Sequence, residues 1–250
     1  MSSTPARASA NCFGRGEADM PTDPKSFWNG KILGWEECRY GSPDVAPTPF
    51  ERLAARLSGS LRSRLDRAVA LVTPHLPGRR VVELGCGSGL LAERLMAAGA
   101  ASYHGFDIAE VAVDKARARF AGSPYGTSVC FDVAGVGELP PQGDALVLSL
   151  GLFDWLTPAE IDRVFAVGRE GRYFHAVAER RRSLDQWLHR FYVHLSYGHR
   201  TGGYVPQYHS VAEIEAALRR HRLPPCHVHR HPSMRFGIFV SDLPIGGLDR

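Results

Sequence analysis

The chain has 250 residues, of which 44% are hydrophobic and 22% are charged. This composition is ordinary for a soluble globular protein, and the length suffices for one domain with an appended lid. The net charge of +4 at pH 7 permits an anionic substrate. It does not indicate a nucleic-acid-binding protein, because such proteins normally carry a dense stripe of basic residues.

The N-terminal segment and the cysteines indicate where in the cell the protein is located. No apolar run approaches the roughly 18 residues of a membrane span, and residues 1–25 lack the apolar core of a secretory signal. We expect residues 1–25 to be a disordered lead-in. The 5 cysteines are scattered and form no C-x-x-C pair, which favours reduced thiols over disulfides or a zinc site. The sequence therefore predicts a cytoplasmic protein without a membrane segment.

Residues 26–75 are expected to form a helical extension before the main domain. The aromatic-rich segment at 26–41 is predicted to be partly helical, and a Pro/Ser/Asp connector follows it. Leucines four residues apart then mark a helical stripe within 50–75. Because Gly59 interrupts this stripe, we expect either two short helices or one kinked helix.

From residue 76 to 250 the pattern alternates between short apolar runs and helical segments. Strands are predicted at 80–84, 102–108, 127–132, 144–150 and 172–178. Helices are predicted at 90–98, 109–120, 157–167 and 210–223. This alternation indicates βαβ crossovers and a doubly wound sheet. The segments at 225–232 and 235–243 are expected to close the domain as an antiparallel hairpin, and residues 180–207 interrupt the rhythm as an insertion.

Two of these helices carry more specific expectations. The helix at 109–120 is expected to bury Val111, Ala116 and Phe120. The helix at 157–167 has Thr157 as its N-cap, followed by a proline and then by Glu160 at the third position, which is the pattern of a capping box.

The strongest functional signal is VVELGCGSG at residues 81–89. Gly85 and Gly87 remove the Cβ atoms that would keep a ligand from the backbone, and they allow a sharp turn into the following helix. A dinucleotide-binding loop would have a third glycine where Leu90 stands, and the Lys-Ser/Thr pair of a P-loop is absent. Glu83, within the strand, is a poor neighbour for a pyrophosphate and a good one for a cationic ligand.

This segment resembles the first motif of the class I S-adenosylmethionine-dependent methyltransferases, and the resemblance continues in order to about residue 243. It implies a Rossmann-like, doubly wound, seven-stranded sheet that is mostly parallel and has an antiparallel last strand. It also implies S-adenosylmethionine as cofactor and S-adenosylhomocysteine as product. The cofactor-binding residues implied by the resemblance are Glu83, Gly85, Cys86, Gly87, Asp107, Ile108, Asp132, Val133, Ser149 and Leu150.

Within that set, the resemblance assigns separate parts of the cofactor to separate residues. Asp107 is placed beside the ribose, because a carboxylate can accept hydrogen bonds from both hydroxyls of a vicinal diol. Asp132 is placed beside the adenine amino group. Ser149 and Leu150 are placed beside the methionine half. Structural alternatives remain for Glu83, as a buried strand acid tied to backbone amides, and for Asp132, as a turn-forming residue. Gly89 could serve only the packing of the helix.

The methyl group of a sulfonium is already electrophilic, so its transfer needs an in-line nucleophile and exclusion of water. An alcohol or phenol acceptor also needs a base, and the candidates are His175, Asp154 and His209. Each has a structural alternative. His175 could be a hydrogen-bonded core histidine, Asp154 could brace a loop, and His209 could orient Tyr208 or cap the next helix.

No metal site is predicted. His227, His229 and His231 alternate, so on a strand they would share one face, but no carboxylate or cysteine accompanies them there. We expect that face to be exposed to solvent.

The insertion at 180–207 is the most informative segment for the substrate, because it mixes arginines with aromatic residues. Such side chains could grip a flat or anionic small molecule, or lie against single-stranded RNA. An amphipathic helix with Leu188, Phe191 and Leu195 on the core explains much of the same pattern. Together with residues 26–41, the insertion is expected to form a lid over the acceptor pocket.

We therefore expect a methyltransferase that acts on an oxygen, or else a nitrogen, of a small-molecule acceptor of anionic or aromatic character. The alternatives are an RNA or protein methyltransferase, or a non-catalytic S-adenosylmethionine-binding protein. Nucleic acid and membrane are not expected partners. The sequence leaves the oligomeric state and the acceptor open.

Overall fold

The computed structural model describes residues 23–40, 63–181, 186, 204–234 and 237–244. Residues 1–22 of the predicted lead-in, the first leucines of the stripe at 50–75 and most of the insertion at 180–207 therefore lie outside the described residues. The predicted lead-in is wrong at its end, because residues 24 and 25 already belong to a helix. Within the described part of the chain, no helix has both the length and the apolar character needed to cross a bilayer.

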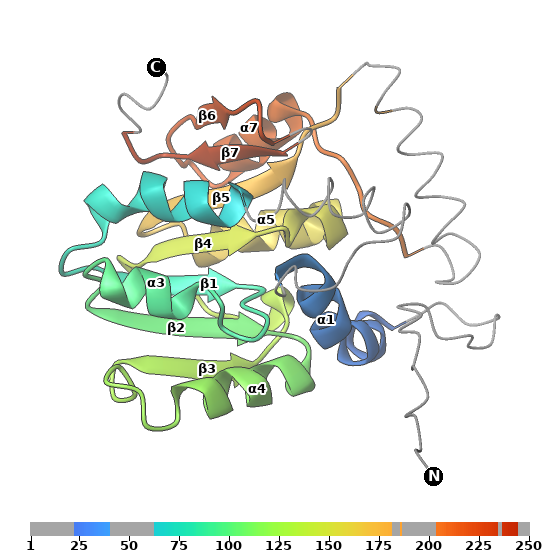
Figure 1. Ribbon diagram of the computed structural model, residues 1–250. Coiled ribbons are helices and arrows are strands. Elements are labelled where there is room, and N and C mark those ends of the chain that lie inside the picture. The colour runs from blue at the N-terminus through green and yellow to red at the C-terminus, as the bar shows by residue number, and fades with distance from the viewer. Residues whose placement is uncertain (1–22, 41–62, 182–185, 187–203, 235–236, 245–250) are drawn as a thin grey trace, which may run out of the picture.

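Seven strands form one sheet in the order β3-β2-β1-β4-β5-β7-β6 (Figure 1). Neighbouring strands pair in parallel except at β7, which runs antiparallel to both β5 and β6. This confirms the predicted Rossmann-like sheet and its antiparallel closing hairpin. The strands are β1 (Arg80–Leu84), β2 (Ser102–Asp107), β3 (Val129–Val133), β4 (Leu146–Leu150), β5 (Arg172–Ala178), β6 (His227–Arg230) and β7 (Gly237–Ser241).

Helices cover both faces of the sheet, because alternate residues of each strand point to opposite sides. On β1, Val81 packs into one hydrophobic cluster with α3, α4 and a helix at residues 63–72, whereas Val82 packs into a second cluster with α5 and α7. The helices are α1 (Pro24–Tyr40), α3 (Ala92–Ala97), α4 (Glu110–Phe120), α5 (Pro158–Val167) and α7 (Val211–Arg220), with single 3-10 turns η1 (Thr73–His75), η2 (Val136–Glu138) and η3 (Phe153–Trp155).

The capping box predicted for α5 is confirmed. The Thr157 hydroxyl accepts a hydrogen bond from the Glu160 amide at 3.3 Å, and the Glu160 carboxylate accepts one from the Thr157 amide at 2.8 Å. Two backbone donors of the first turn are thereby satisfied, so the helix starts where the sequence predicts it.

Two burial expectations are wrong. In α4, Val111 is 38% exposed, while Val113 is fully buried together with Ala116 and Phe120. Val113, Ala116 and Phe120 share the helix face that packs on the sheet, and Val111 lies off this face. In β6, His229 is buried, with its ring stacked 6.2 Å from Phe239, because the pairing with β7 turns it inward.

Helix α1 lies at the carboxyl ends of β1 and β2 and packs beside the start of α4 (Figure 1). Ile32 of α1 is buried against Ala109 and Ala112. The Asn29 side-chain oxygen accepts a hydrogen bond from the Val111 amide at 3.3 Å. These contacts place a segment that precedes the domain next to the glycine-rich loop.

The two valines of α4 form a matched pair that tests this helix orientation. We expect Val113→Ala to lower the free energy of unfolding by about 2 kcal/mol, because it leaves a cavity in the core. We expect Val111→Ala to change it by less than about 0.5 kcal/mol, as at other surface positions. Urea denaturation monitored by circular dichroism measures both, and equal losses would contradict the orientation.

Candidate active site

The loop after β1 turns through three glycines with left-handed backbone conformations. The φ angles are +72° at Gly85, +52° at Gly87 and +73° at Gly89, values that residues with a Cβ rarely adopt. The amides of Gly85 and Cys86 donate to the Phe106 carbonyl at 2.8 and 3.0 Å. The loop is therefore bound to the end of β2.

Two of these glycines are also required by contacts. A Cβ on Gly89 would lie 2.9 Å from the Phe131 ring and 3.2 Å from the Ala116 side chain, so Gly89 lets the loop approach β3 and α4. A Cβ on Gly87 would overlap with the Glu36 carboxylate of α1. The packing alternative for Gly89 is thus the one that the contacts support, while Gly87 faces a charged group.

Asp107, at the end of β2, is fixed by two backbone amides. Its Oδ2 accepts from the Gly87 amide at 2.8 Å and its Oδ1 from the Ala109 amide at 2.9 Å. Burial raises the pKa of this carboxyl, although both amides act against the rise. A carboxylate offers about four acceptor positions, so Asp107 keeps capacity for the two hydroxyls of a ribose.

Glu83 points into the interior from β1 and is 3% exposed. Its carboxylate accepts a hydrogen bond from the buried Tyr103 hydroxyl of β2. Burial raises the pKa of Glu83 to about 8, against the lowering effect of the Tyr103 hydrogen bond and with added repulsion from Asp107 and Glu36. Glu83 is thus a buried strand acid tied to a tyrosine, and not to backbone amides.

The site includes a residue that the sequence did not reveal, Glu36 of α1. Its Oε1 accepts a hydrogen bond from the Ser88 amide of the glycine loop at 2.9 Å. The residue is 7% exposed, and its Oε2 is buried without a hydrogen-bond partner among the described residues. The sequence offered only an acid in an aromatic helix, far from the loop, with no motif around it.

The residues expected around the adenine lie at the ends of β2 and β3. Ile108 and Val133 are half-buried. Asp132 is engaged by two partners, His104 at 2.7 Å and the Arg117 guanidinium at 3.3 Å. Its contact with the adenine amino group stays a prediction.

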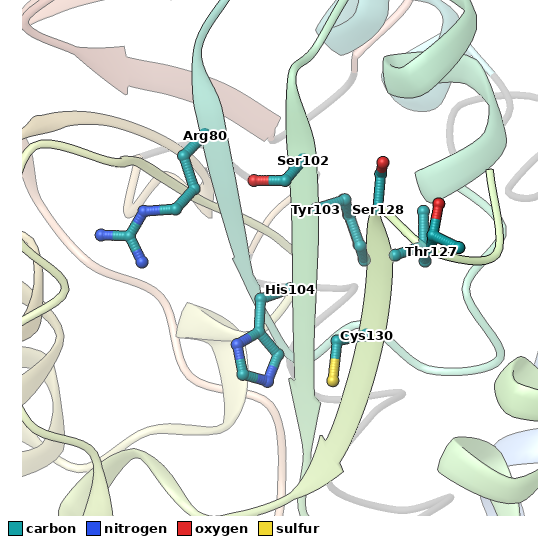
Figure 2. Close-up of a pocket in the computed structure, with 8 residues that line it drawn as sticks. Arg80, Ser102, Tyr103, His104, Thr127, Ser128 and Cys130 are labelled. Atoms are coloured by element: carbon teal, nitrogen blue, oxygen red, sulfur yellow. The ribbon is translucent and has the colours of Figure 1, made fainter.

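His104, Cys130 and Asp132 bring three potential metal ligands within 4.8 Å of one another. A hollow on the same sheet is lined by residues 102–104 and 127–130 together with Arg80 (Figure 2). Figure 2 shows His104 and Cys130 beside each other on neighbouring strands, in agreement with their direct pairing. Because the hollow follows the first half of β2, it is separate from the glycine loop at the strand's other end.

His175 lies inside the core on β5. Its Nδ1 is 3.0 Å from the Ser149 hydroxyl of β4, and its ring lies 4.9 Å from that of Phe153. Burial lowers the pKa of His175 to about 3, so the ring is neutral at physiological pH. This environment favours the core interpretation, and a role as base stays a prediction. Since the Ser149 hydroxyl is engaged here, a cofactor contact of Ser149 and Leu150 would involve the backbone or Leu150.

Asp154 and His209 meet near the end of β5. Asp154 Oδ1 accepts from the Ala178 amide at 2.9 Å, and the His209 amide donates to the Ala178 carbonyl at 2.9 Å. His209 Nε2 lies 2.9 Å from the Phe153 carbonyl. The structure therefore brings these two candidates together, with hydrogen bonds that brace the chain; their catalytic roles stay predictions.

Four aromatic rings gather where α1 meets η3, and we call them the aromatic cluster: Phe27, Trp28, Trp155 and Tyr204. The Trp28 and Trp155 rings are 4.9 Å apart and nearly perpendicular, and Tyr204 lies 5.1 Å from Trp155. The Trp28 indole donates to the Tyr204 hydroxyl at 3.2 Å. Ring contacts thus join helix α1, the segment after β4 and Tyr204 at the end of the insertion. The lid itself stays a prediction.

The raised pKa of Glu83 predicts a pH-dependent stability. Between pH 4.5 and about 8 the folded protein keeps a proton on Glu83 that the unfolded chain releases. The free energy of unfolding should therefore fall as the pH rises through this window. Glu83→Gln should remove that part of the slope and stabilise the protein above pH 8, while the exposed Glu93→Gln serves as control. Urea denaturation across the window measures this, and identical slopes in all three proteins would contradict it.

Comparison with known proteins adds to this geometry. A family model described as a methyltransferase domain matches residues 81–169. Ribosomal RNA small subunit methyltransferase A of Parasynechococcus marenigrum is 36% identical over 97 residues, which are 39% of this chain and 28% of that protein. The chain thus covers well under half the length of this curated relative.

Solved structures share the fold. Magnesium protoporphyrin IX methyltransferase from Synechocystis, with bound SAH, matches 87% of this chain and 96% of its own, with 20% identity and a TM-score of 0.64. A possible exported protein from Bordetella parapertussis matches 88% of this chain and 82% of its own, with 14% identity and a TM-score of 0.67. Residues 81–169 thus match a methyltransferase domain, and the solved structures show that the chain shares the fold of a methyltransferase with bound SAH.

Proposed function

We propose that this protein transfers a methyl group from S-adenosylmethionine to an oxygen, or else a nitrogen, of a small-molecule acceptor. The observation that carries the proposal is Asp107, buried and held by two backbone amides beside the left-handed glycine at position 87. A carboxylate fixed in this way at the end of the second strand is suited to a vicinal diol.

The residues of the site fit this cofactor. Gly87 allows the loop to turn beside Asp107 with a left-handed backbone, and Asp107 would hold the ribose. Ile108 and Val133 offer half-buried apolar surface for a flat base. When bound, the cofactor supplies an electrophilic methyl group on a sulfonium. The chain's own part is to orient that group and to exclude water from it.

The acceptor should lie beyond the carboxyl ends of β4 and β5, where open α/β sheets place their ligands. The aromatic cluster stands at this end of the molecule, with Asp154 and His209 nearby. Rings arranged in this way favour a flat or partly apolar acceptor. An alcohol would further need a base, and Asp154 and His209 are the candidates whose position suits this end of the sheet.

The charges also favour a small molecule over RNA. Several described arginines are paired with acids within the protein, among them Arg180 with Glu213, Arg181 with Glu179 and Arg220 with Asp162. Paired arginines contribute little to a basic surface for phosphates. RNA remains the alternative, which the similarity to a ribosomal RNA methyltransferase supports. The scattered spacing of the cysteines, without a C-x-x-C pair, supports a cytoplasmic location.

Cofactor binding can be measured by thermal unfolding. At a concentration 100-fold above its Kd, S-adenosylmethionine should stabilise the protein by about 2.7 kcal/mol and raise its Tm. Asp107→Ala should abolish the shift because it removes the ribose acceptor, whereas the exposed Asp114→Ala should keep it. A shift with NAD and none with S-adenosylmethionine would contradict the proposal.

The acceptor class can be tested by incubating the purified protein with tritiated-methyl S-adenosylmethionine and a cell extract. The extract is then separated into small-molecule, RNA and protein fractions. We expect label in the small-molecule fraction, and none when Asp107→Ala replaces the wild type. Label confined to RNA or protein would overturn the small-molecule assignment but keep the methyltransferase.

A further inference from the structure

We propose that Glu36 of helix α1 is a cofactor-binding residue whose carboxylate makes the site prefer the cationic sulfonium cofactor to its neutral-sulfur product. This inference rests on the proposed function and adds to it a specificity-determining residue outside the matched domain at 81–169. It concerns how the site tells substrate from product, and not how the methyl acceptor is chosen.

The position of Glu36 is set by the packing of α1. Ile32 is buried against Ala109 and Ala112, and residues four apart lie on the same face of a helix. Glu36 therefore points toward the domain, where its Oε1 accepts from the Ser88 amide at 2.9 Å. The carboxylate is held against the loop beside Gly87, whose left-handed φ of +52° favours a glycine.

The second oxygen of Glu36 indicates a missing partner. Oε2 is buried and has no hydrogen-bond partner among the described residues, and a buried charged oxygen without a partner is costly. Polar atoms of this kind are usually satisfied by a ligand or by water. The other oxygen, Oε1, lies against Gly87, so the carboxylate stands beside the loop of the proposed cofactor site. The partner expected for Oε2 is therefore the bound cofactor.

The charge of the site indicates the sign of that partner. Glu36, Glu83 and Asp107 are all buried, and the charge of Glu36 raises the pKa of both other carboxyls. The described hydrogen-bond partners of the three acids are backbone amides and the Tyr103 hydroxyl, and none of these is a cation. The Arg119 guanidinium reaches the loop, but it donates to the Ser88 hydroxyl at 3.4 Å. Glu83 keeps its proton up to about pH 8, so a cationic ligand would relieve chiefly the repulsion between Glu36 and Asp107.

The cofactor and its product differ in this respect. S-adenosylmethionine carries a sulfonium, an ammonium and a carboxylate, and is therefore a net cation. S-adenosylhomocysteine has lost the sulfonium charge with the methyl group and is net neutral. A site with surplus negative charge attracts S-adenosylmethionine more than S-adenosylhomocysteine. Methyl transfer itself would therefore lower the affinity of the site for the product.

Isothermal titration calorimetry with S-adenosylmethionine and S-adenosylhomocysteine tests the inference on wild type, Glu36→Gln and the exposed control Glu110→Gln. We expect Glu36→Gln to raise the Kd of S-adenosylmethionine by about tenfold, as for the loss of one charge-assisted contact. The Kd of S-adenosylhomocysteine should rise by much less. The control should leave both unchanged. Equal losses for the two ligands, no loss, or tighter binding of both would overturn the inference.

A second measurement needs no variant at this position. An S-adenosyl analogue with a protonated amine in place of the sulfonium should bind the wild type with an affinity closer to that of S-adenosylmethionine than to that of S-adenosylhomocysteine. Affinity equal to that of S-adenosylhomocysteine would count against the inference. Wild type that binds none of these ligands would refute the proposed function itself, whereas binding without charge preference would refute only the role of Glu36.

Discussion

The hydrogen bonds of the Asp107 carboxylate are the constraint on which the site depends. They join the loop after β1, through Gly87, to the backbone at Ala109 just before α4. One side chain at the end of β2 therefore sets the distance between two segments that both face the ligand. The Gly85 and Cys86 amides bind the same loop to the end of β2, and Ala109 is also a residue on which Ile32 of α1 packs.

Much of the fold could be predicted because local signals agree with the topology. β1 and β5 begin and end at the predicted residues, since continuous apolar runs end there at glycine or charge. α5 begins at its capping box. The burial of Val111 and His229 was misjudged for a physical reason: a helical or alternating pattern shows that one face is buried, but the neighbouring element decides which residues lie on it.

The candidate site was only partly visible in the sequence. The glycines could be identified because their close spacing after an apolar strand marks a sharp turn, and Asp107 could be identified because the resemblance to the methyltransferase motif implies an acid at the end of the second strand. Glu36 could not, because its role arises from the packing of Ile32 on α4 and not from any neighbour in sequence. His175 is the reverse case, because the sequence suggested it as a base and the structure places it in the core. Its ring lies beside Phe153 and its Nδ1 is within hydrogen-bond distance of the Ser149 hydroxyl.

The crowding around Gly87 and Gly89 changes how mutations in this loop should be interpreted. At Gly89 a methyl group would meet Phe131 and Ala116, and at Gly87 it would meet Glu36, in each case an atom of the protein itself. Intolerance to substitution at these positions therefore reports the internal fit of the loop before it reports a ligand. A loss of cofactor binding in a variant at either glycine therefore needs a test of folding before it is assigned to the ligand.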